Sequence, residues 1–190
     1  MKNTLVLTLD YINDIVNENG KIARYADRIT TYQVLENANK VLKWARDNSM
    51  AIAHVKVGFS PNYLECPKNS PMFSKSAEFG ALKLGTWGCD FDKRLNVEEN
   101  DFVIIKHRVS AFYNTDLGVL LSALKIEKII MLGVATNYAI DHSARDAHDR
   151  DYEVVVVTDA SQAHSDQAHE ASLESIGRFS QLIKVDDLIS

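Results

Sequence analysis

The amino-acid sequence predicts one α/β domain over residues 1–190, in which a parallel sheet of six strands lies between two layers of helices. Three observations lead to this fold class. Short apolar runs typical of strands alternate with longer segments of helical periodicity along most of the chain. The runs are almost continuously apolar, as in strands that are covered on both faces. Finally, 46% of the 190 residues are hydrophobic, which is enough for one full-sized core.

Each expected element has its own pattern. The strands are runs of β-branched and aliphatic residues, and they span residues 3–10, 50–57, 101–107, 127–134, 152–160 and 180–185. Between them, apolar residues recur at helical spacing, which predicts helices over residues 31–48, 115–126, 137–151 and 165–179. In the first of these helices the apolar stripe consists of Val34, Leu35, Ala38, Val41, Leu42 and Ala45. Such alternation is typical of a parallel sheet with helices on both faces, giving three layers, α/β/α.

Residues 58–100 are the exception to this alternation. They contain all three prolines of the chain and show little periodicity. Segments of this length without regular structure are usually functional when they occur in a compact domain. We therefore expect residues 58–100 to act as a lid over a binding site or as a contact between subunits.

Composition limits the partners of the chain. The formal net charge is −5, and the 21 basic residues are scattered among 26 acidic ones, which argues against nucleic acid as a partner. No apolar run approaches membrane-spanning length, and the N-terminus shows no signal-peptide pattern. Two cysteines are too few for a disulfide framework. We expect a cytoplasmic protein that acts on a small molecule and binds neither nucleic acid nor membrane.

Three strand ends are expected to meet at one edge of the sheet. Asp10 and Lys106 each follow an apolar run directly, and residues 133–139 lead from another strand into a helix. The carboxyl ends of parallel strands collect the ligand-binding loops of open α/β sheets. A buried Asp and Lys would offset each other's desolvation, and such pairs cluster at functional sites. Taken singly, Asp10 could be a turn residue, Lys106 could reach out to water, and the turn could be an ordinary connection.

Three segments resemble the defining segments of the isochorismatase-like hydrolases, also called the cysteine-hydrolase superfamily. They are "LVLTLDYINDIV", "VIIKHRVSAFYNTDL" and "GVATNYAIDHSARDAHDRDYEVVVVTDA", and they occur in the order and at the separations of that family. A fourth stretch, "LGTWGCDF", resembles one hydrolase branch. The resemblance covers nearly the whole chain and implies a Rossmann-type fold with a six-stranded parallel sheet.

The resemblance also implies roles for individual residues. Asp10 would be the catalytic acid or base, and Lys106 would be its charged neighbour. A cis peptide bond is implied between Val134 and Ala135, although such a bond is costly for a non-proline residue. It would turn the amide groups of Ala135 and Ala139 toward the substrate.

One position departs from the pattern of the amidase members of the family. Ala139 stands where they carry a nucleophilic Cys, and the cysteines of this chain, Cys66 and Cys89, lie within residues 58–100. Without a thiol at position 139 a covalent acyl-enzyme cannot form there, so we expect hydrolysis by activated water. Isochorismatases resemble this chain in lacking the Cys, which implies a vinyl ether such as isochorismate as the substrate. A water-dependent amide hydrolase and a catalytically silent binding protein are the alternatives.

The remaining expectations concern the pocket, metals and assembly. The candidate substrate contacts near the expected mouth are Phe59, Trp87, Phe112, Asn137 and Tyr138; for the aromatic residues, packing in the core or between subunits is the alternative. Lys56 could bind an anionic substrate or simply lie exposed. The six histidines do not show metal-binding spacing, so neither a metal nor another cofactor is expected. Family members commonly form dimers or tetramers, which implies a homodimer or homotetramer.

Overall fold

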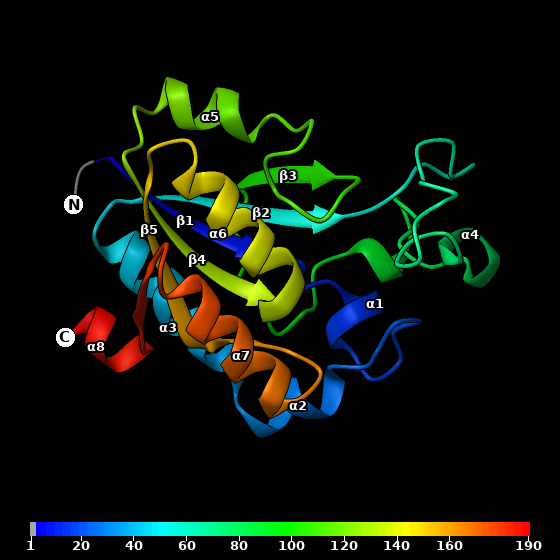
Figure 1. Cartoon of the computed structure of the whole chain (residues 1–190), viewed down its shortest axis with the longest axis horizontal. Coiled ribbons are helices and arrows are strands. Elements are labelled where there is room, and N and C mark those ends of the chain that lie inside the picture. The colour runs from blue at the N-terminus through cyan, green and yellow to red at the C-terminus, as the bar shows by residue number, and fades with distance from the viewer. Residues whose placement is uncertain (1–2) are drawn as a thin grey trace.

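The computed structural model describes residues 3–190, which form a six-stranded sheet between two layers of helices (Figure 1). All neighbouring strands run parallel, in the order β3-β2-β1-β4-β5-β6. The strands are β1 (Thr4–Leu9), β2 (Ala51–Val57), β3 (Phe102–Lys106), β4 (Lys128–Val134), β5 (Glu153–Gln162) and β6 (Gln181–Ile183). The predicted fold class is therefore confirmed.

The eight described helices are α1 (Asn13–Val16), α2 (Ala26–Thr31), α3 (Val34–Asp47), α4 (Ser76–Phe79), α5 (Leu117–Ala123), α6 (Asp141–His148), α7 (Asp166–Ile176) and α8 (Val185–Ile189). Six of them form the two layers on the faces of the sheet, while α1 and α4 lie beyond the carboxyl ends of the strands (Figure 1). Helix α3 packs on one face together with α2 and α8, while α5, α6 and α7 cover the other face (Figure 1). The short helices α1, α2, α4 and α8 were not predicted, because so few residues show no periodicity. Within residues 3–190, no helix combines the length and the apolar character needed to cross a membrane.

Alternate residues of the central strand β1 pack against the two layers. Leu5, Leu7 and Leu9 belong to the core beneath α5 and α6, whereas Val6 belongs to the core beneath α3. All four side chains are fully buried, and each contributes roughly 2 kcal/mol through removal of apolar surface from water. Because both faces of β1 are covered, its sequence is apolar throughout rather than alternating.

The order of the strands changes direction between β1 and β4. The chain runs from β1 outward to β2 and β3, and then returns to place β4 on the other side of β1. In open α/β sheets, ligands bind in the crevice above the carboxyl ends of the strands at such a switch point. Asp10 follows β1 and Ala135 follows β4, so both residues lie at this crevice.

Gly133 allows β4 to approach β1 closely just below the crevice. It pairs with Leu9 and has a φ of 153°, a conformation that favours glycine. A Cβ atom built at Gly133 would lie 2.3 Å from the carbonyl oxygen of Leu9. The pairing of β4 with β5 also shifts register between Met131 and Gly133. A side chain at this position would push β4 away from β1.

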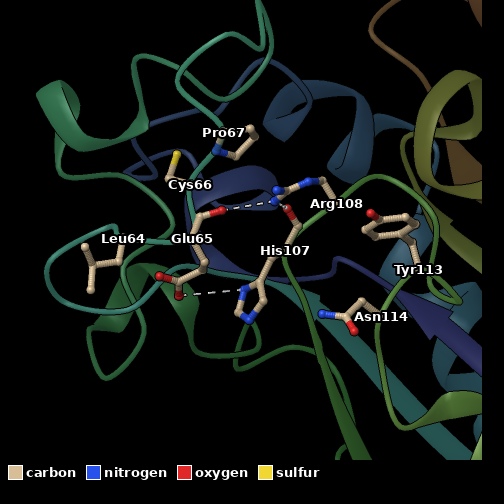
Figure 2. Close-up of a pocket in the computed structure, with 8 residues that line it drawn as sticks. All are labelled: Leu64, Glu65, Cys66, Pro67, His107, Arg108, Tyr113 and Asn114. Carbon is tan, nitrogen blue, oxygen red and sulfur yellow. Dashed lines mark hydrogen bonds and ion pairs between the residues drawn. The ribbon is translucent and has the colours of Figure 1, made fainter.

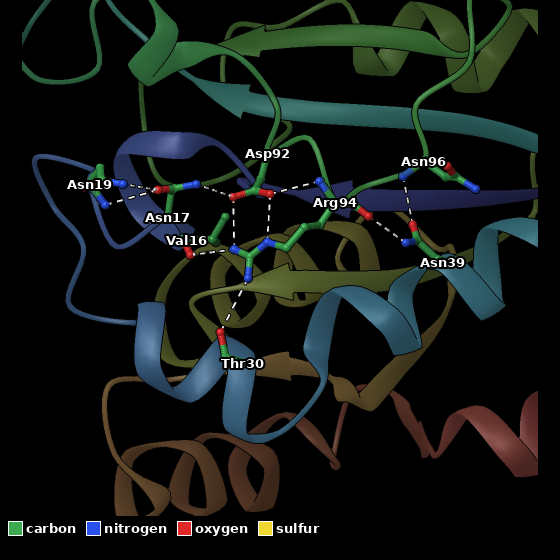
Figure 3. Close-up of polar contacts among 8 residues, drawn as sticks. All are labelled: Val16, Asn17, Asn19, Thr30, Asn39, Asp92, Arg94 and Asn96. Atoms are coloured by element: carbon green, nitrogen blue, oxygen red, sulfur yellow. Dashed lines mark hydrogen bonds and ion pairs between the residues drawn. The ribbon is translucent and has the colours of Figure 1, made fainter.

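Residues 58–100 contain little regular structure apart from α4 and the short 3₁₀-helix η1 (Trp87–Cys89). Their C-terminal part is tied to α1 by a polar cluster around Arg94 (Figure 3). The Arg94 guanidinium donates to the two Asp92 carboxylate oxygens at 2.9 and 3.0 Å and to the Val16 carbonyl at 3.1 Å. Asp92 also accepts from the Asn17 side chain at 3.0 Å. Burial disfavours the charged form, but the hydrogen bonds from Arg94 and Asn17 lower the pKa of Asp92 below its usual value.

We predict that Gly133→Ala lowers the free energy of unfolding by about 2 to 3 kcal/mol, because overpacking against fixed backbone is not relieved by a rotamer change. Gly118→Ala in α5 is the matched control, since a Cβ atom there meets no heavy atom within 4 Å. The control should stabilise the fold by roughly 0.5 to 1 kcal/mol, as expected for alanine in place of glycine in a helix. Urea unfolding measures both changes, and equal effects at the two positions would contradict the close approach of β4 and β1.

Candidate active site

A buried ion pair lies at the crevice, where β1 and β3 end. The Asp10 carboxylate and the Lys106 ammonium group are 2.7 Å apart, and the two residues are 4% and 1% exposed. Val57 ends the intervening strand β2 and donates its backbone N–H to the second Asp10 oxygen at 2.8 Å. Lys106 Nζ also donates to the Val109 carbonyl at 2.7 Å. The two charged residues predicted at strand ends therefore contact each other, and each has a further hydrogen-bond partner.

The backbone turns sharply at Asp10. Its φ is 60°, in the left-handed region that few residues other than glycine adopt. Aspartate tolerates this region better than most residues. The Asp10 N–H still donates to the Val55 carbonyl at 2.9 Å, so the chain leaves the sheet only after this residue. Backbone conformations of this kind are concentrated at functional sites.

Burial and Lys106 act on the Asp10 carboxyl group in opposite directions. Desolvation raises the pKa of Asp10, whereas the Lys106 charge and the hydrogen bonds from Lys106 and Val57 lower it, and the net result is a raised pKa. A carboxyl group with a raised pKa exchanges its proton closer to neutral pH, as general acid–base catalysis requires. The arrangement suits either of the two roles, acid or base, that the sequence leaves open.

The ion pair faces a cavity of about 770 Å³, which is a typical size for a small-molecule site. Its larger apolar side chains are Ile15, Ile22, Val57, Met72, Phe73, Phe79, Leu82, Val109 and Val134. Its ionisable side chains are Asp10, Lys21, Arg24, Tyr25, Lys75, Lys106 and Tyr138. Besides the edge of the sheet, two segments contribute most of the lining: the loop between α1 and α2, and residues 71–82.

The third predicted strand end also reaches this cavity. The residues of the turn that line it are Ala135, Tyr138 and Ala139. The Val134-Ala135 peptide bond is cis. The π-helix η2 (Thr136–Ile140) follows, and π-helical turns are frequent at functional sites. Thr136 fixes the turn to α7, because its hydroxyl lies 2.9 Å from His169 Nδ1 and its carbonyl accepts from the Ser172 hydroxyl at 3.1 Å.

Tyr25 also lines the cavity, although the sequence does not predict it. It is 8% exposed, and burial raises its pKa to about 12, with Tyr138 and Asp10 acting in the same direction and Arg24 in the opposite one. Its hydroxyl therefore remains protonated within electrostatic reach of Asp10, as a hydrogen-bond donor. The loop that carries Tyr25 has no periodicity. Its grouping with two basic residues, Lys21 and Arg24, is the signal that could have drawn attention to it.

Four predicted substrate contacts lie away from the cavity. Phe59 is fully buried in a core formed largely by residues 58–100. Phe112 is buried in the core beneath α5 and α6. Trp87 is 51% exposed, and Asn137 has a buried side-chain oxygen without a partner among the described residues, but neither lines the cavity. Phe59 and Phe112 therefore pack in these cores rather than along the cavity. Lys56 does not line the cavity either, and its ammonium group lies 5.2 Å from the centroid of the Phe91 ring.

The described part of the chain brings no thiol to the cavity. Cys66 and Cys89 are both buried in the core of residues 58–100, and neither lines the cavity. Burial raises the pKa of both thiols, that of Cys89 to about 12, so they are not nucleophilic thiolates near neutral pH. Ala139 lines the cavity instead.

The described residues 3–190 contain no group of three or more His, Cys, Asp or Glu side chains placed to hold a metal ion. The buried His54 illustrates a structural use of histidine. Its two ring nitrogens lie 2.7 Å from the Thr8 hydroxyl and 3.0 Å from the Asp101 carboxylate. Desolvation lowers the pKa of His54, with Asp101 opposing this shift. A neutral His54 thus connects β1 and β2 to the residue that precedes β3.

A second pocket of about 340 Å³ lies beside the end of β3 (Figure 2). It is lined by Leu64, Glu65, Cys66, Pro67, His107, Arg108, Tyr113 and Asn114. Lys106 lines the first cavity and His107 lines the second, as expected for consecutive residues of an extended chain. Arg108 donates to the carbonyls of Glu65 and His107 at 3.1 and 2.6 Å. The hydrogen bond from Arg108 to Glu65 thus joins the end of β3 to residues 58–100.

Known proteins share both the sequence pattern and the fold. Residues 4–187 match the family model of the isochorismatase domain. The isochorismatase family protein YwoC of Bacillus subtilis is 30% identical over 144 residues, which cover 76% of this chain and 75% of that protein. The ureidoacrylate amidohydrolase RutB of Methylorubrum extorquens is 28% identical over 190 aligned positions, and the match covers 93% of this chain and 77% of that protein.

A solved structure of a cysteine hydrolase from Pseudomonas syringae has the same fold, with a TM-score of 0.88 at 20% identity, over 98% of this chain and 91% of that chain. At this identity the likeness concerns the fold alone. The match to the family model, in contrast, extends over almost all of the sequence. The chain therefore belongs to the isochorismatase family of hydrolases.

Proposed function

We propose that this chain hydrolyses a carbon–nitrogen bond of a small amide or ureido compound, with Asp10 activating a water molecule. The observation that carries the proposal is the buried Asp10–Lys106 pair, which faces a cavity whose described lining includes Ala139 and no cysteine. The sequence alone favours a vinyl ether over an amide as the substrate. The relatives favour carbon–nitrogen chemistry, because RutB, which matches 93% of this chain, is named for an amidohydrolase activity.

In this proposal the nucleophile is a water molecule beside Ala139. The ionised Asp10 carboxylate takes a proton from the water as its oxygen attacks the carbonyl carbon of the substrate. Protonated Asp10 then gives this proton to the leaving nitrogen, the carbon–nitrogen bond breaks, and the acid and amine products depart. The raised pKa of Asp10 supports both halves of the cycle, because the same carboxyl group must accept and release one proton.

Lys106 and the turn after β4 have complementary tasks in this mechanism. The Lys106 ammonium group, 2.7 Å from Asp10, keeps the carboxylate accessible in its ionised form despite burial. The backbone N–H groups of Ala135 and Ala139 stabilise the negative charge that develops on the carbonyl oxygen of the substrate. Residues 71–82 line the cavity and act as a lid that limits the access of bulk water.

Vinyl ether hydrolysis is the second candidate, and the raised pKa of Asp10 favours it. In this reaction a protonated Asp10 delivers its proton to the terminal methylene carbon. Water then adds to the resulting oxocarbenium carbon, and the hemiketal breaks down to a ketone and an alcohol. Both candidates use Asp10 and Lys106, so only substrates of both classes separate them.

We predict that Asp10→Asn lowers kcat/KM toward an amide or ureido substrate by roughly 10²- to 10⁴-fold, because the carboxamide can neither accept nor release the proton. Product release from a panel of small amides, ureido compounds and isochorismate measures this loss. Asp47→Asn, which removes a carboxylate from the exposed pair with Lys43 on α3, is the control and should retain activity.

Two results would reject the proposal for Asp10. In the first, wild type cleaves isochorismate and no amide, and Asp10→Asn abolishes the cleavage. This result would establish the vinyl ether reaction in place of amide hydrolysis. A folded wild-type protein that binds members of the panel but turns over none of them would indicate a silent binding protein.

We also predict that Ala139→Cys creates a reactive thiol in the cavity, because the new Sγ atom would lie at the wall near Asp10 and Lys106. The variant should hydrolyse amides about tenfold faster or more, and iodoacetamide should inactivate it. The wild-type enzyme should resist iodoacetamide, since both of its cysteines are buried. Ala139→Ser is the control of similar size. An unlabelled thiol and an unchanged rate in the Cys variant would contradict the placement of Ala139 at the reacting position.

A further inference from the structure

The cavity wall carries more positive charge than its one carboxylate can balance. Four of the described lining residues are basic, namely Lys21, Arg24, Lys75 and Lys106, and Asp10 is the only acidic one. The chain as a whole has a formal net charge of −5. The positive charge is therefore a local property of this cavity.

The basic residues differ in how their side chains are used. Lys106 is paired with Asp10, and Lys21 Nζ donates to the Gly80 carbonyl at 2.7 Å. Within residues 3–190, Arg24 and Lys75 make neither an ion pair nor a side-chain hydrogen bond. Two cationic groups at the cavity thus have their donors available for a ligand.

Arg24 and Lys75 come from two segments that the structure joins at the cavity. Arg24 lies in the loop between α1 and α2, whereas Lys75 immediately precedes α4. The hydrogen bond from Lys21 to Gly80 connects this loop to the end of α4. The two cations therefore belong to a cavity rim that is held together by a direct contact.

Unpaired charge of one sign in a concave site attracts ligands of the opposite sign and raises their local concentration. A guanidinium group also recognises a carboxylate through two parallel hydrogen bonds, which supply orientation as well as affinity. The apolar wall between the rim and Asp10 suits the short carbon skeleton of a small substrate. A substrate with a carboxylate at one end and its scissile bond at the other would match this arrangement.

We infer that the cavity selects an anionic substrate, whose carboxylate is bound by Arg24 and Lys75 while its scissile amide or ureido group lies at Asp10 and Ala139. This inference rests on the proposed function for the identity of the scissile group. The two basic residues are specificity determinants, and the reaction itself does not require them.

Isothermal titration with a matched pair of probes tests the inference separately from catalysis. The probes are 3-ureidopropionate and its uncharged analogue 3-ureidopropionamide. They are titrated into the double variant Asp10→Asn/Lys106→Met, so that neither hydrolysis nor a Lys106 charge left without its partner affects the comparison. The carboxylate should bind about tenfold more tightly than the carboxamide or better. Rising ionic strength should weaken binding of the carboxylate alone, because salt screens the charges at the exposed rim.

Arg24→Met and Lys75→Met, made in the same background, should each weaken carboxylate binding about tenfold and leave carboxamide binding unchanged. Lys43→Met is the control, since it removes one positive charge from α3 outside the cavity. Equal affinity for the two probes, no binding of the carboxylate, or equal losses for both probes in Arg24→Met would overturn the inference. A different outcome is that the carboxylate binds in an Arg24-dependent way but wild type turns over no substrate. This would reject the proposed function, whereas the inferred anion site would still be supported.

Discussion

The contact between the Asp10 carboxylate and the Lys106 ammonium group is the constraint on which the rest of the site depends. Either charge alone, at this depth, would lose several kcal/mol of hydration without compensation. The pair is tolerated because the two groups lie 2.7 Å apart and because the backbone of Val57 and Val109 provides further hydrogen bonds. Asp10, Val57 and Lys106 lie at the carboxyl ends of three adjacent strands, so the strand order itself determines that the two charges meet. Burial then gives Asp10 its raised pKa, and with it the capacity for proton transfer.

The same crevice explains the strict packing requirement at Gly133. The turn after β4 must lie close enough to β1 for Ala135 and Ala139 to share a cavity with Asp10. The approach of Gly133 to the Leu9 backbone brings the two strands to that separation. The site therefore combines a rigid floor, formed by the strand ends, with a rim of loops that carries the unpaired basic groups. In our proposal the strand ends carry out the chemistry, and the loops of the rim determine which substrate binds.

The sequence predicts the parts of this molecule that follow regular periodicity. Continuous apolar runs indicate strands covered on both faces, and parallel strands bring their ends to one edge, so the meeting of Asp10 and Lys106 could be expected. The wall of the cavity could not be predicted in the same way. Phe59 and Phe112 turned out to be core residues, because a lone aromatic residue in an irregular segment gives no indication of which side it faces. Tyr25 was missed for the complementary reason, since its position at the cavity depends on how a loop without periodicity packs.

The pH dependence of kcat/KM in wild type and in Lys106→Met, for a substrate that the enzyme turns over, tests the central claim most directly. If Asp10 is the base, the rate rises with pH through the raised pKa of Asp10, because only the ionised carboxylate activates water. Lys106→Met removes the charge and the hydrogen bond that lower this pKa, so the rising limb should move to higher pH. A rising limb at the same pH in both proteins would contradict the account. A kcat/KM that falls as the pH rises through the pKa of Asp10 would contradict it as well.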